Sequence, residues 1–233
     1  MPKSLTHSQQ ITKFYTLVEQ ASCRLANHFT PELPRERVLS WLSQNVPKPR
    51  LQHILRVEQT AIALAQHHQL AVDKAAQAGL LHDLAKYFEP ERLLAMAKAE
   101  GLALTEVDLA DPHLLHADVS AIVARDEFAV SDPEILAAVR NHTLGQPGMS
   151  QLCCVVFLAD SLEPGRGTSP ELEDIRQACL DNLYQAVLQV CDRTFAHLIN
   201  HHRLIHPRMV LTRNWALQLS SDLTTPPPKK LNL

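Results

Sequence analysis

The apolar residues of this 233-residue chain recur at the spacing of an α-helix along nearly its whole length. Residues three, four and seven apart share one face of a helix, whereas a half-buried strand alternates apolar and polar residues. Short alternating runs of β-branched residues between turns are missing, and glycine is scarce, with six residues. The pattern therefore predicts an all-α fold and argues against β-sandwiches and parallel sheets.

Prolines and turn residues divide this pattern into separate helices. We expect helices at Ile11–Phe29, Arg35–Val46, Leu51–His67, Val72–Leu81, Pro90–Glu100, Ala117–Asp126, Pro133–Asn141, Ser150–Leu162, Pro170–Val190 and Asp192–His202. Proline stops a helix or disfavours it at the preceding residue, so Pro47 and Pro49 close the second of these. The apolar stretch Leu152–Ala159 fits a buried strand or a buried helix. We interpret it as a helix because no other segment offers a strand to pair with it.

The chain is expected to have three parts. Residues 1–49 form an N-terminal extension of two helices, residues 50–215 form the main helical bundle, and residues 216–233 form a disordered tail that ends in the polar, proline-rich TTPPPKKLNL. Both extension helices carry apolar stripes that must be buried, namely Phe14, Leu17 and Val18 on the first and Val38, Trp41 and Leu42 on the second. We expect these stripes to pack on the same chain. A partner protein or a second copy, as in a homodimer, is the alternative.

Composition restricts the classes of partner. The formal net charge is −3, so no global basic field attracts nucleic acid or an anionic membrane. The first residues, MPKSLTHSQQ, lack an apolar signal core, and no stretch approaches the length of a membrane span. The five cysteines form no CxxC pair, which argues against a zinc knuckle and a disulfide framework. We therefore expect a cytoplasmic protein.

A set of histidine and aspartate side chains indicates a metal centre. His82 and Asp83 are adjacent at the end of a helical pattern, in GLLHDLAK, where both can point at one cation. Four further residues lie at the polar edge of an otherwise apolar helical face: His53, His116, His142 and Asp160. A single buried histidine is ordinarily a hydrogen-bonded core imidazole, but buried charges are paired or bound to metal, so the set together points to cations. Nitrogen and oxygen ligands suit a divalent transition metal, with iron expected first, manganese and zinc as alternatives, and one or two ions.

Three polar residues lie close to these ligands in the sequence. Lys86 follows Asp83 by one helical turn, and Arg166 follows Asp160 by six residues, beyond a Pro-Gly turn from which it could swing back over the centre. Guanidinium groups bind phosphate through paired hydrogen bonds. Thr143 is a candidate hydroxyl donor. These residues are expected to contact a phosphate-bearing substrate, although a solvated side chain is the alternative for Lys86.

The order of the ligands is familiar. His53, His82-Asp83 and Asp160 resemble the H…HD…D signature of the HD-domain metal-dependent phosphohydrolases. His116 and His142-Thr143 resemble the branch whose site can hold two metals.

Longer strings are more selective than the signature. Five of them are similar to the bacterial YqeK-type family of symmetrical bis(5′-nucleosyl)-tetraphosphatases, which split diadenosine tetraphosphate into two ADP. They are RLQHILRV, LLHDLAK, HADVSAIVARDEF, RNHTLG and FLADSLEPGR. The similarity runs from about Arg50 to about Asn214. It implies an all-α HD-domain bundle and a substrate that is a dinucleotide polyphosphate, with ADP as the product.

The resemblance also implies roles for individual residues. The first metal ion is expected to be held by His53, His82, Asp83 and Asp160, while a second metal or a phosphate group is contacted by His116 and His142. The catalytic residues implied are Asp83, Lys86, His116 and His142. The substrate-binding residues implied are Asp83, Lys86, His116, His142, Thr143, Asp160 and Arg166. A metal-activated water attacks phosphorus in this scheme.

Two alternatives stay open at this point. One is an HD phosphohydrolase that acts on other nucleotides or on alarmones, and the other is a non-catalytic sensor that binds metal and nucleotide. The chain has no Gly-rich P-loop and no GxGxxG, which argues against a kinase and a dehydrogenase.

Overall fold

The computed structural model describes residues 7–21, 28–30 and 33–221. Within these ranges every regular element is helical, which confirms the expected all-α fold. The α-helices are α1 (His7–Ala21), α2 (Arg35–Asn45), α3 (Lys48–His67), α4 (Val72–Leu81), α5 (Pro90–Ala99), α6 (Glu106–Ala110), α7 (His116–Phe128), α8 (Pro133–Asn141), α9 (Gln151–Leu162), α10 (Pro170–Asp181), α11 (Leu183–Asn200) and α12 (Pro207–Ser221). The 3-10 helices η2 (Pro112–Leu115) and η3 (Pro164–Arg166) precede α7 and α10. None of the described helices combines the length and hydropathy that crossing a membrane requires.

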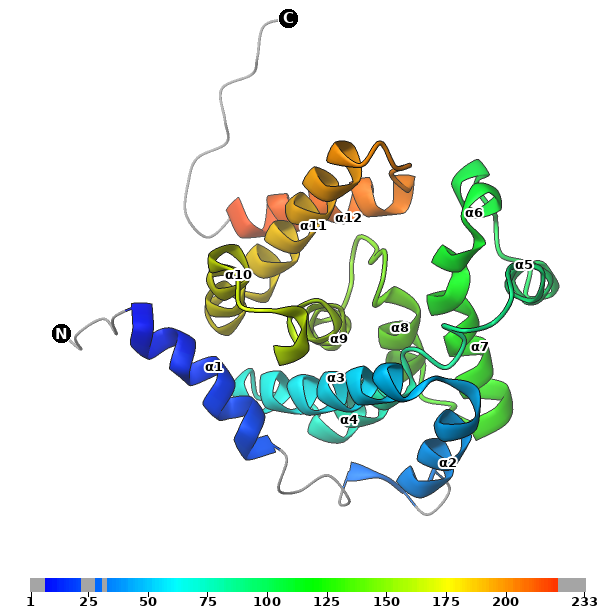
Figure 1. Ribbon diagram of the computed structural model, residues 1–233, viewed down its shortest axis with the longest axis horizontal. Helices are drawn as coiled ribbons and strands as arrows, with labels where there is room; N and C mark the ends of the chain where they lie inside the picture. Colours follow the sequence, from blue (N-terminus) through cyan, green and yellow to red (C-terminus); the bar gives the residue numbers. More distant parts are fainter. Residues whose placement is uncertain (1–6, 22–27, 31–32, 222–233) are drawn as a thin grey trace, which may run out of the picture.

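Helix α9 forms the centre of the bundle. All residues from Leu152 to Ala159 are buried, and α9 contacts α3, α4, α8, α10 and α11. Figure 1 shows α9 nearly end-on in the middle of the molecule, between the α3–α4 pair and the α11–α12 pair. A helix that is apolar on all sides is suited to such a position. The ambiguous stretch LCCVVFLA is therefore a buried helix, as expected.

Helices α3 and α4 approach each other closely at Gly79. A Cβ atom at this position would lie 2.9 Å from the Cα atom of Glu58, so a glycine is needed where the two backbones meet. This approach brings His53 on α3 near His82 at the end of α4, with their ring centroids 5.5 Å apart.

The two N-terminal helices pack on the same chain, as expected. Their buried residues include Phe14 and Val18 on α1 and Val38 and Leu42 on α2, and these belong to the same core as α3, α4 and α9. Arg35 of α2 donates hydrogen bonds from Nε and Nη2 to the two carboxylate oxygens of Glu58, at 2.8 and 2.6 Å. The Glu58 side chain on α3 is completely buried, so α2 supplies the partner for a charge inside the bundle.

The predicted helix Pro170–Val190 is wrong in one respect, because the structure divides it at Asn182. This residue has extended backbone angles (φ −153°, ψ 109°), and its side-chain oxygen accepts hydrogen bonds from two N–H groups in the first turn of α11. Asparagine is a strong N-cap, and here it ends α10 and starts α11. Helix α11 then continues through the break that had been expected before Asp192.

Other helix ends also differ from the expectation. Helix α1 is described from His7 to Ala21, residues 22–27 of the predicted helix lie outside the described part, and Phe29 is not helical. Helices α6 and α12 were not expected, and α12 includes residues 216–221, which had been assigned to the tail. The inner face of α12 carries Met209, Thr212 and Ala216, and the polar Thr212 and the small Ala216 weaken its apolar period. The predicted disorder of residues 222–233 concerns residues outside the described part.

Candidate metal centre

The expected ligand residues meet at one place in the bundle. They are His53 from α3, His82 and Asp83 from the end of α4, His116 from the start of α7, His142 after the end of α8, and Asp160 from α9. All are buried except Asp160, whose side chain is 20% exposed.

Helix ends fix the orientation of three of the imidazoles. His82, His116 and His142 each place Nδ1 2.5–2.7 Å from the carbonyl oxygen of the residue three positions earlier. A carbonyl oxygen can only accept a hydrogen bond. Nδ1 therefore carries the proton in each ring, and the Nε2 lone pair points into the centre.

The orientation of His53 is fixed by Glu163, which sequence reasoning missed. Nδ1 of His53 lies 3.0 Å from Oε1 of Glu163. The Glu163 carboxylate in turn accepts hydrogen bonds from Nε of Arg56 and from the N–H of Gly165, both at 2.5 Å. Burial alone would raise the pKa of Glu163, but the contacts with His53, Arg56 and Gly165 lower it to about 2. Glu163 lies in the string ADSLEP, yet its position after the end of α9 gave no sign that it faces His53.

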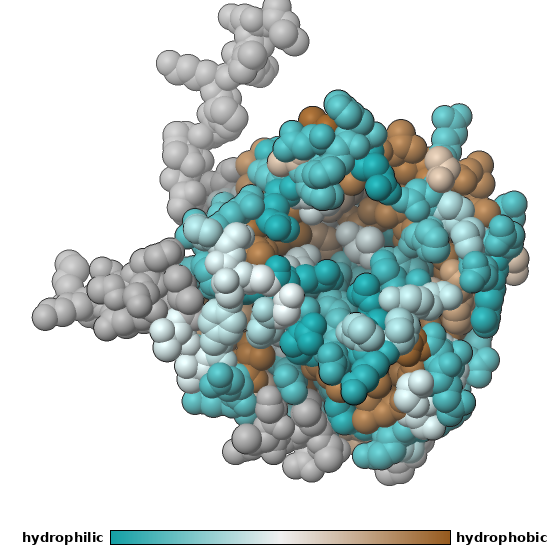
Figure 2. Space-filling view, viewed as in Figure 1, coloured by the Kyte–Doolittle hydropathy of each residue, from teal (hydrophilic) through white to brown (hydrophobic). Residues whose placement is uncertain are grey.

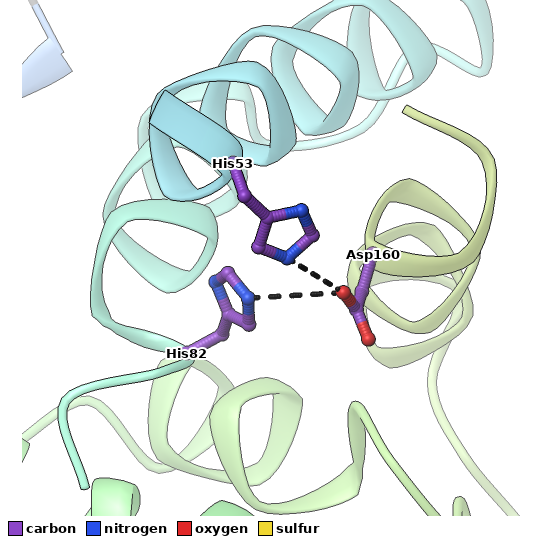
Figure 3. A group of neighbouring side chains, drawn as sticks. All are labelled: His53, His82 and Asp160. Atoms are coloured by element: carbon purple, nitrogen blue, oxygen red, sulfur yellow. Dashed lines mark ion pairs between the residues drawn. The ribbon is translucent and has the colours of Figure 1, made fainter. Parts of the chain in front are cut away.

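The Nε2 atoms and the carboxylates form two overlapping groups with metal-ligand spacing. One is His53, His82 and Asp160, shown in Figure 3, and the other is His82, Asp83 and His142; within each, the donor atoms lie within 4.8 Å of one another. Nε2 of His53 is 3.0 Å from Oδ1 of Asp160, and Nε2 of His82 is 3.3 Å from Oδ2 of Asp83.

His116 adds a further nitrogen to the second group. Its Nε2 lies 3.1 Å from Nε2 of His142 and 3.4 Å from Oδ1 of Asp83. The same atom is 3.3 Å from Nζ of Lys86 and 3.2 Å from Oγ1 of Thr143. Burial lowers the pKa of His116 to about 4 and also lowers the pKa of Lys86, so the imidazole stays neutral near neutral pH.

Both central carboxylates are ionised in spite of their burial. Burial alone would raise the pKa of Asp83, but the surrounding imidazoles, His82 foremost, hold it well below its usual range. For Asp160 the effect of burial is likewise outweighed, in this case by His53 and Arg166, which lower its pKa. The centre therefore presents negatively charged oxygens beside the Nε2 atoms of the histidines.

This set of donors fits a divalent metal ion. Within the described part of the chain, the buried Nε2 atoms of His53 and His82 have no hydrogen-bond partner, although carboxylate oxygens lie nearby. Lone pairs that face acceptor-only oxygens are satisfied by a cation, and mixed imidazole and carboxylate ligands suit iron, manganese and zinc.

Two arginines border the centre. Arg166 donates from Nη2 to Oδ1 of Asp160 at 2.5 Å and from Nε to the carbonyl oxygen of the same residue at 2.7 Å, so it swings back over the centre as the sequence suggested. Arg50, which sequence reasoning missed as a site residue, places Nη1 3.0 Å from Oδ2 of Asp83. It lies three residues before His53 on α3, one turn away, and that spacing was the available signal.

A cavity of about 740 Å³ opens beside the centre, and we call it the deep cavity. It reaches the centre at His142, Thr143, Asp160 and Arg166, and it extends between α6, α10 and α11. Figure 2 shows a hollow in this face of the molecule, below the ridge that α11 and α12 form. Its volume is within the range of about 300–1,000 Å³ that holds small-molecule ligands.

Comparisons with known proteins agree with this geometry. The HD domain family model matches residues 50–165. The chain is 34% identical over 181 residues to "Bis(5′-nucleosyl)-tetraphosphatase, symmetrical" from Bacillus subtilis, an alignment that covers 78% of this chain and 96% of that protein. It is 31% identical to the protein of the same name from Halalkalibacterium halodurans, over 78% of this chain and 97% of that protein. A crystal structure titled "predicted HD superfamily hydrolase involved in NAD metabolism", from Clostridium acetobutylicum, matches with a TM-score of 0.76 and 30% identity, over 79% of this chain and 97% of that chain.

Proposed function

Because the chain belongs to the HD-domain family and is related to the symmetrical bis(5′-nucleosyl)-tetraphosphatases, we propose that it hydrolyses diadenosine tetraphosphate at the central anhydride to give two ADP. The observation that carries the proposal is the convergence of four inward-facing Nε2 atoms and two ionised carboxylates beside a cavity large enough for a nucleoside.

In this proposal the six ligand residues have distinct tasks. The first metal ion is held by His53, His82, Asp83 and Asp160, and a second ion or a phosphate group is contacted by His116 and His142. We expect iron first, with manganese and zinc as alternatives, because the donors suit all three. When bound, the metal acidifies a water molecule and neutralises charge on the phosphate oxygens.

The residues around the ligands bind and orient the polyphosphate. Lys86 and Arg166 place positive charge beside the centre, where negative charge on the non-bridging oxygens is stabilised in phosphoryl transfer. Arg50, on α3, adds a further positive charge next to Asp83. Thr143, whose hydroxyl lies 3.2 Å from Nε2 of His116, donates to a phosphate oxygen. The deep cavity receives one nucleoside, with its phosphates directed toward the centre.

The products distinguish the proposal from its rivals. The purified protein is incubated with diadenosine tetraphosphate and iron or manganese, and the nucleotides are separated by chromatography. Symmetrical cleavage yields ADP alone, whereas unsymmetrical cleavage yields AMP and ATP. A preference for mononucleotides or alarmones would favour the enzymatic rival, and metal binding without turnover would favour the sensor.

Asp83→Ala provides the control for metal dependence. Asp83 is the carboxylate that faces His82, His116 and His142, so its removal is expected to strip the metal and abolish turnover. Wild-type metal content and turnover in this variant would contradict the assignment of the centre.

A homodimer is a separate prediction, which the molar mass from light scattering tests.

A further inference from the structure

A second, shallower cavity of about 230 Å³ borders the metal centre, and we call it the arginine cavity. It touches the centre at Arg50 and His53, whereas the deep cavity touches it at His142 and Asp160. Arg166 lines both cavities. A linear ligand whose middle lies at the metal centre can therefore extend into both.

The arginine cavity is built to bind anions. Its lining includes three guanidinium groups, those of Arg50, Arg56 and Arg166, whose side chains are 23%, 35% and 38% exposed. Arg50 and Arg166 pair with carboxylates of the centre and Arg56 pairs with Glu163, but each guanidinium has more donors than one carboxylate can accept. Since the chain as a whole carries a net charge of −3, these local cations are what a polyphosphate would meet.

An aromatic ring completes the arginine cavity. Tyr87 lines it and is 50% exposed, one of the few large rings at the surface of the described part. The ring follows Lys86 directly, so it lies next in the chain to a cation of the centre. Exposed aromatic rings beside arginines bind nucleotides by stacking on the base, with little preference for which base.

The loop after α9 forms part of the wall of this cavity. Gly165 lies directly beneath Arg56, and a side chain at this position would collide with the guanidinium. The glycine thereby leaves room for Arg56 in the position where it holds Glu163.

We propose that the arginine cavity binds the second nucleotide half of the substrate, with its phosphates on Arg50 and Arg166 and its base stacked on the ring of Tyr87. The inference rests on the proposed function and adds that the two halves of a symmetrical substrate are held unequally. One nucleoside is enclosed in the deep cavity. The other lies at the surface, because about 230 Å³ is too small to enclose a nucleoside.

Two ligands distinguish the binding of one nucleoside half of the substrate from the binding of the other. The first is the analogue of diadenosine tetraphosphate with a methylene group between the second and third phosphorus atoms, which cannot be cleaved at the centre. The second is adenosine 5′-tetraphosphate with the same methylene group in the same place, which has one nucleoside and is likewise not cleaved there. Dissociation constants of both ligands are measured by calorimetry on the metal-loaded wild type, Tyr87→Ala, Tyr87→Phe and a control variant, Ile199→Ala. Ile199 is suited to the control because it is 59% exposed.

Tyr87→Ala is expected to weaken the analogue by between about 5-fold and about 150-fold, the loss of one base–aromatic stack. It is expected to leave the affinity for the single-nucleoside ligand unchanged, and Tyr87→Phe is expected to restore binding of the diadenosine analogue because it keeps the ring. Unchanged analogue affinity in Tyr87→Ala would overturn the inference, as would equal weakening of both ligands. Turnover of diadenosine tetraphosphate to ADP by the wild type tests the proposed function separately, so the two failures are distinguishable.

Discussion

At the scale of single residues, the partner of each Nδ1 atom decides what the histidine can bind. Three imidazoles are oriented by backbone carbonyls at helix ends, and the fourth, His53, is oriented by the carboxylate of Glu163. Only the fourth arrangement depends on a side chain, and that side chain is itself held by Arg56 and Gly165. His53 is therefore the proposed ligand most easily disturbed by a change outside the metal centre.

Glu163→Gln tests this dependence. The amide oxygen can still accept from His53, but the side chain loses the charge that Arg56 and the N–H of Gly165 hold in place. Loss of such an outer partner typically lowers metal affinity about 10- to 100-fold. Competition with a chelator measures the affinity, and Glu171→Gln, at an exposed carboxylate on α10, is the matched control. Unchanged metal affinity in Glu163→Gln would mean that Glu163 does not position His53.

Arg166→Ala separates substrate binding from metal binding. Arg166 contacts Asp160 but has no lone pair to offer a metal, so the variant is expected to keep its metal. Its kcat/KM for diadenosine tetraphosphate should fall at least about 10-fold, because a hydrogen bond to a charged group contributes ~1.5–3 kcal/mol. His53→Ala, by contrast, should lose metal. Equal metal loss in the two variants would show that Arg166 is structural.

The positions of the proposed ligands were predictable from the sequence, but the position of Glu163, which orients His53, was not. His53, His116, His142 and Asp160 each continue an apolar helical face, so periodicity alone directs them inward. Glu163 lies after the end of α9, where no period applies, and its contact with His53 spans 110 residues of sequence. Such a contact depends on how helices pack, which a single sequence does not specify.

At the scale of elements, the centre depends on how closely α3 and α4 approach. The close contact at Gly79 sets the separation of His53 and His82, while α9 carries Asp160 toward both. Periodicity predicted most of these helices, including the buried α9. It missed the cap at Asn182, because one residue that ends a helix leaves the apolar spacing of the flanking helices intact.

Gly79→Ala is expected to destabilise the fold even though alanine favours a helix by ~1 kcal/mol over glycine. The added Cβ atom would lie 2.9 Å from the Cα atom of Glu58, a backbone atom that cannot rotate away. Overpacking of this kind costs ~1–3 kcal/mol, so the net change in the free energy of unfolding should be a loss. Urea denaturation measures it. A gain in stability would mean that α3 and α4 separate without cost.

At the scale of the whole molecule, the N-terminal helices are part of the core that supports the centre. All proposed ligands lie after residue 49, so a protein that begins at Lys48 retains every one of them. It would, however, expose the surface that Phe14, Val18, Val38 and Leu42 cover. It would also leave the buried carboxylate of Glu58 without Arg35. Removal of these helices is therefore expected to lower the stability of the fold, and to lower turnover only because the fold is less stable.

Arg35→Met tests the effect of the Arg35–Glu58 ion pair separately from the apolar surface that the N-terminal helices cover. The expected loss of stability depends on pH. The substitution leaves α2 in place but leaves Glu58 unpaired, which costs ~3–5 kcal/mol for a broken buried pair. Burial raises the pKa of Glu58, and Arg35, followed by His28, opposes this rise. Without Arg35 the folded-state pKa should rise further above the unfolded value. The folded variant then binds a proton more tightly than the unfolded chain, so its stability relative to the wild type increases as pH falls.

Urea denaturation of both proteins at about pH 8 and about pH 5 should show that the stability deficit of the variant is smaller at the lower pH. A deficit that is the same at both values, or larger in acid, would mean that the Glu58 charge is not what Arg35 stabilises. In that case, the double variant Arg35→Met/Glu58→Gln would be no more stable at about pH 8 than Arg35→Met alone.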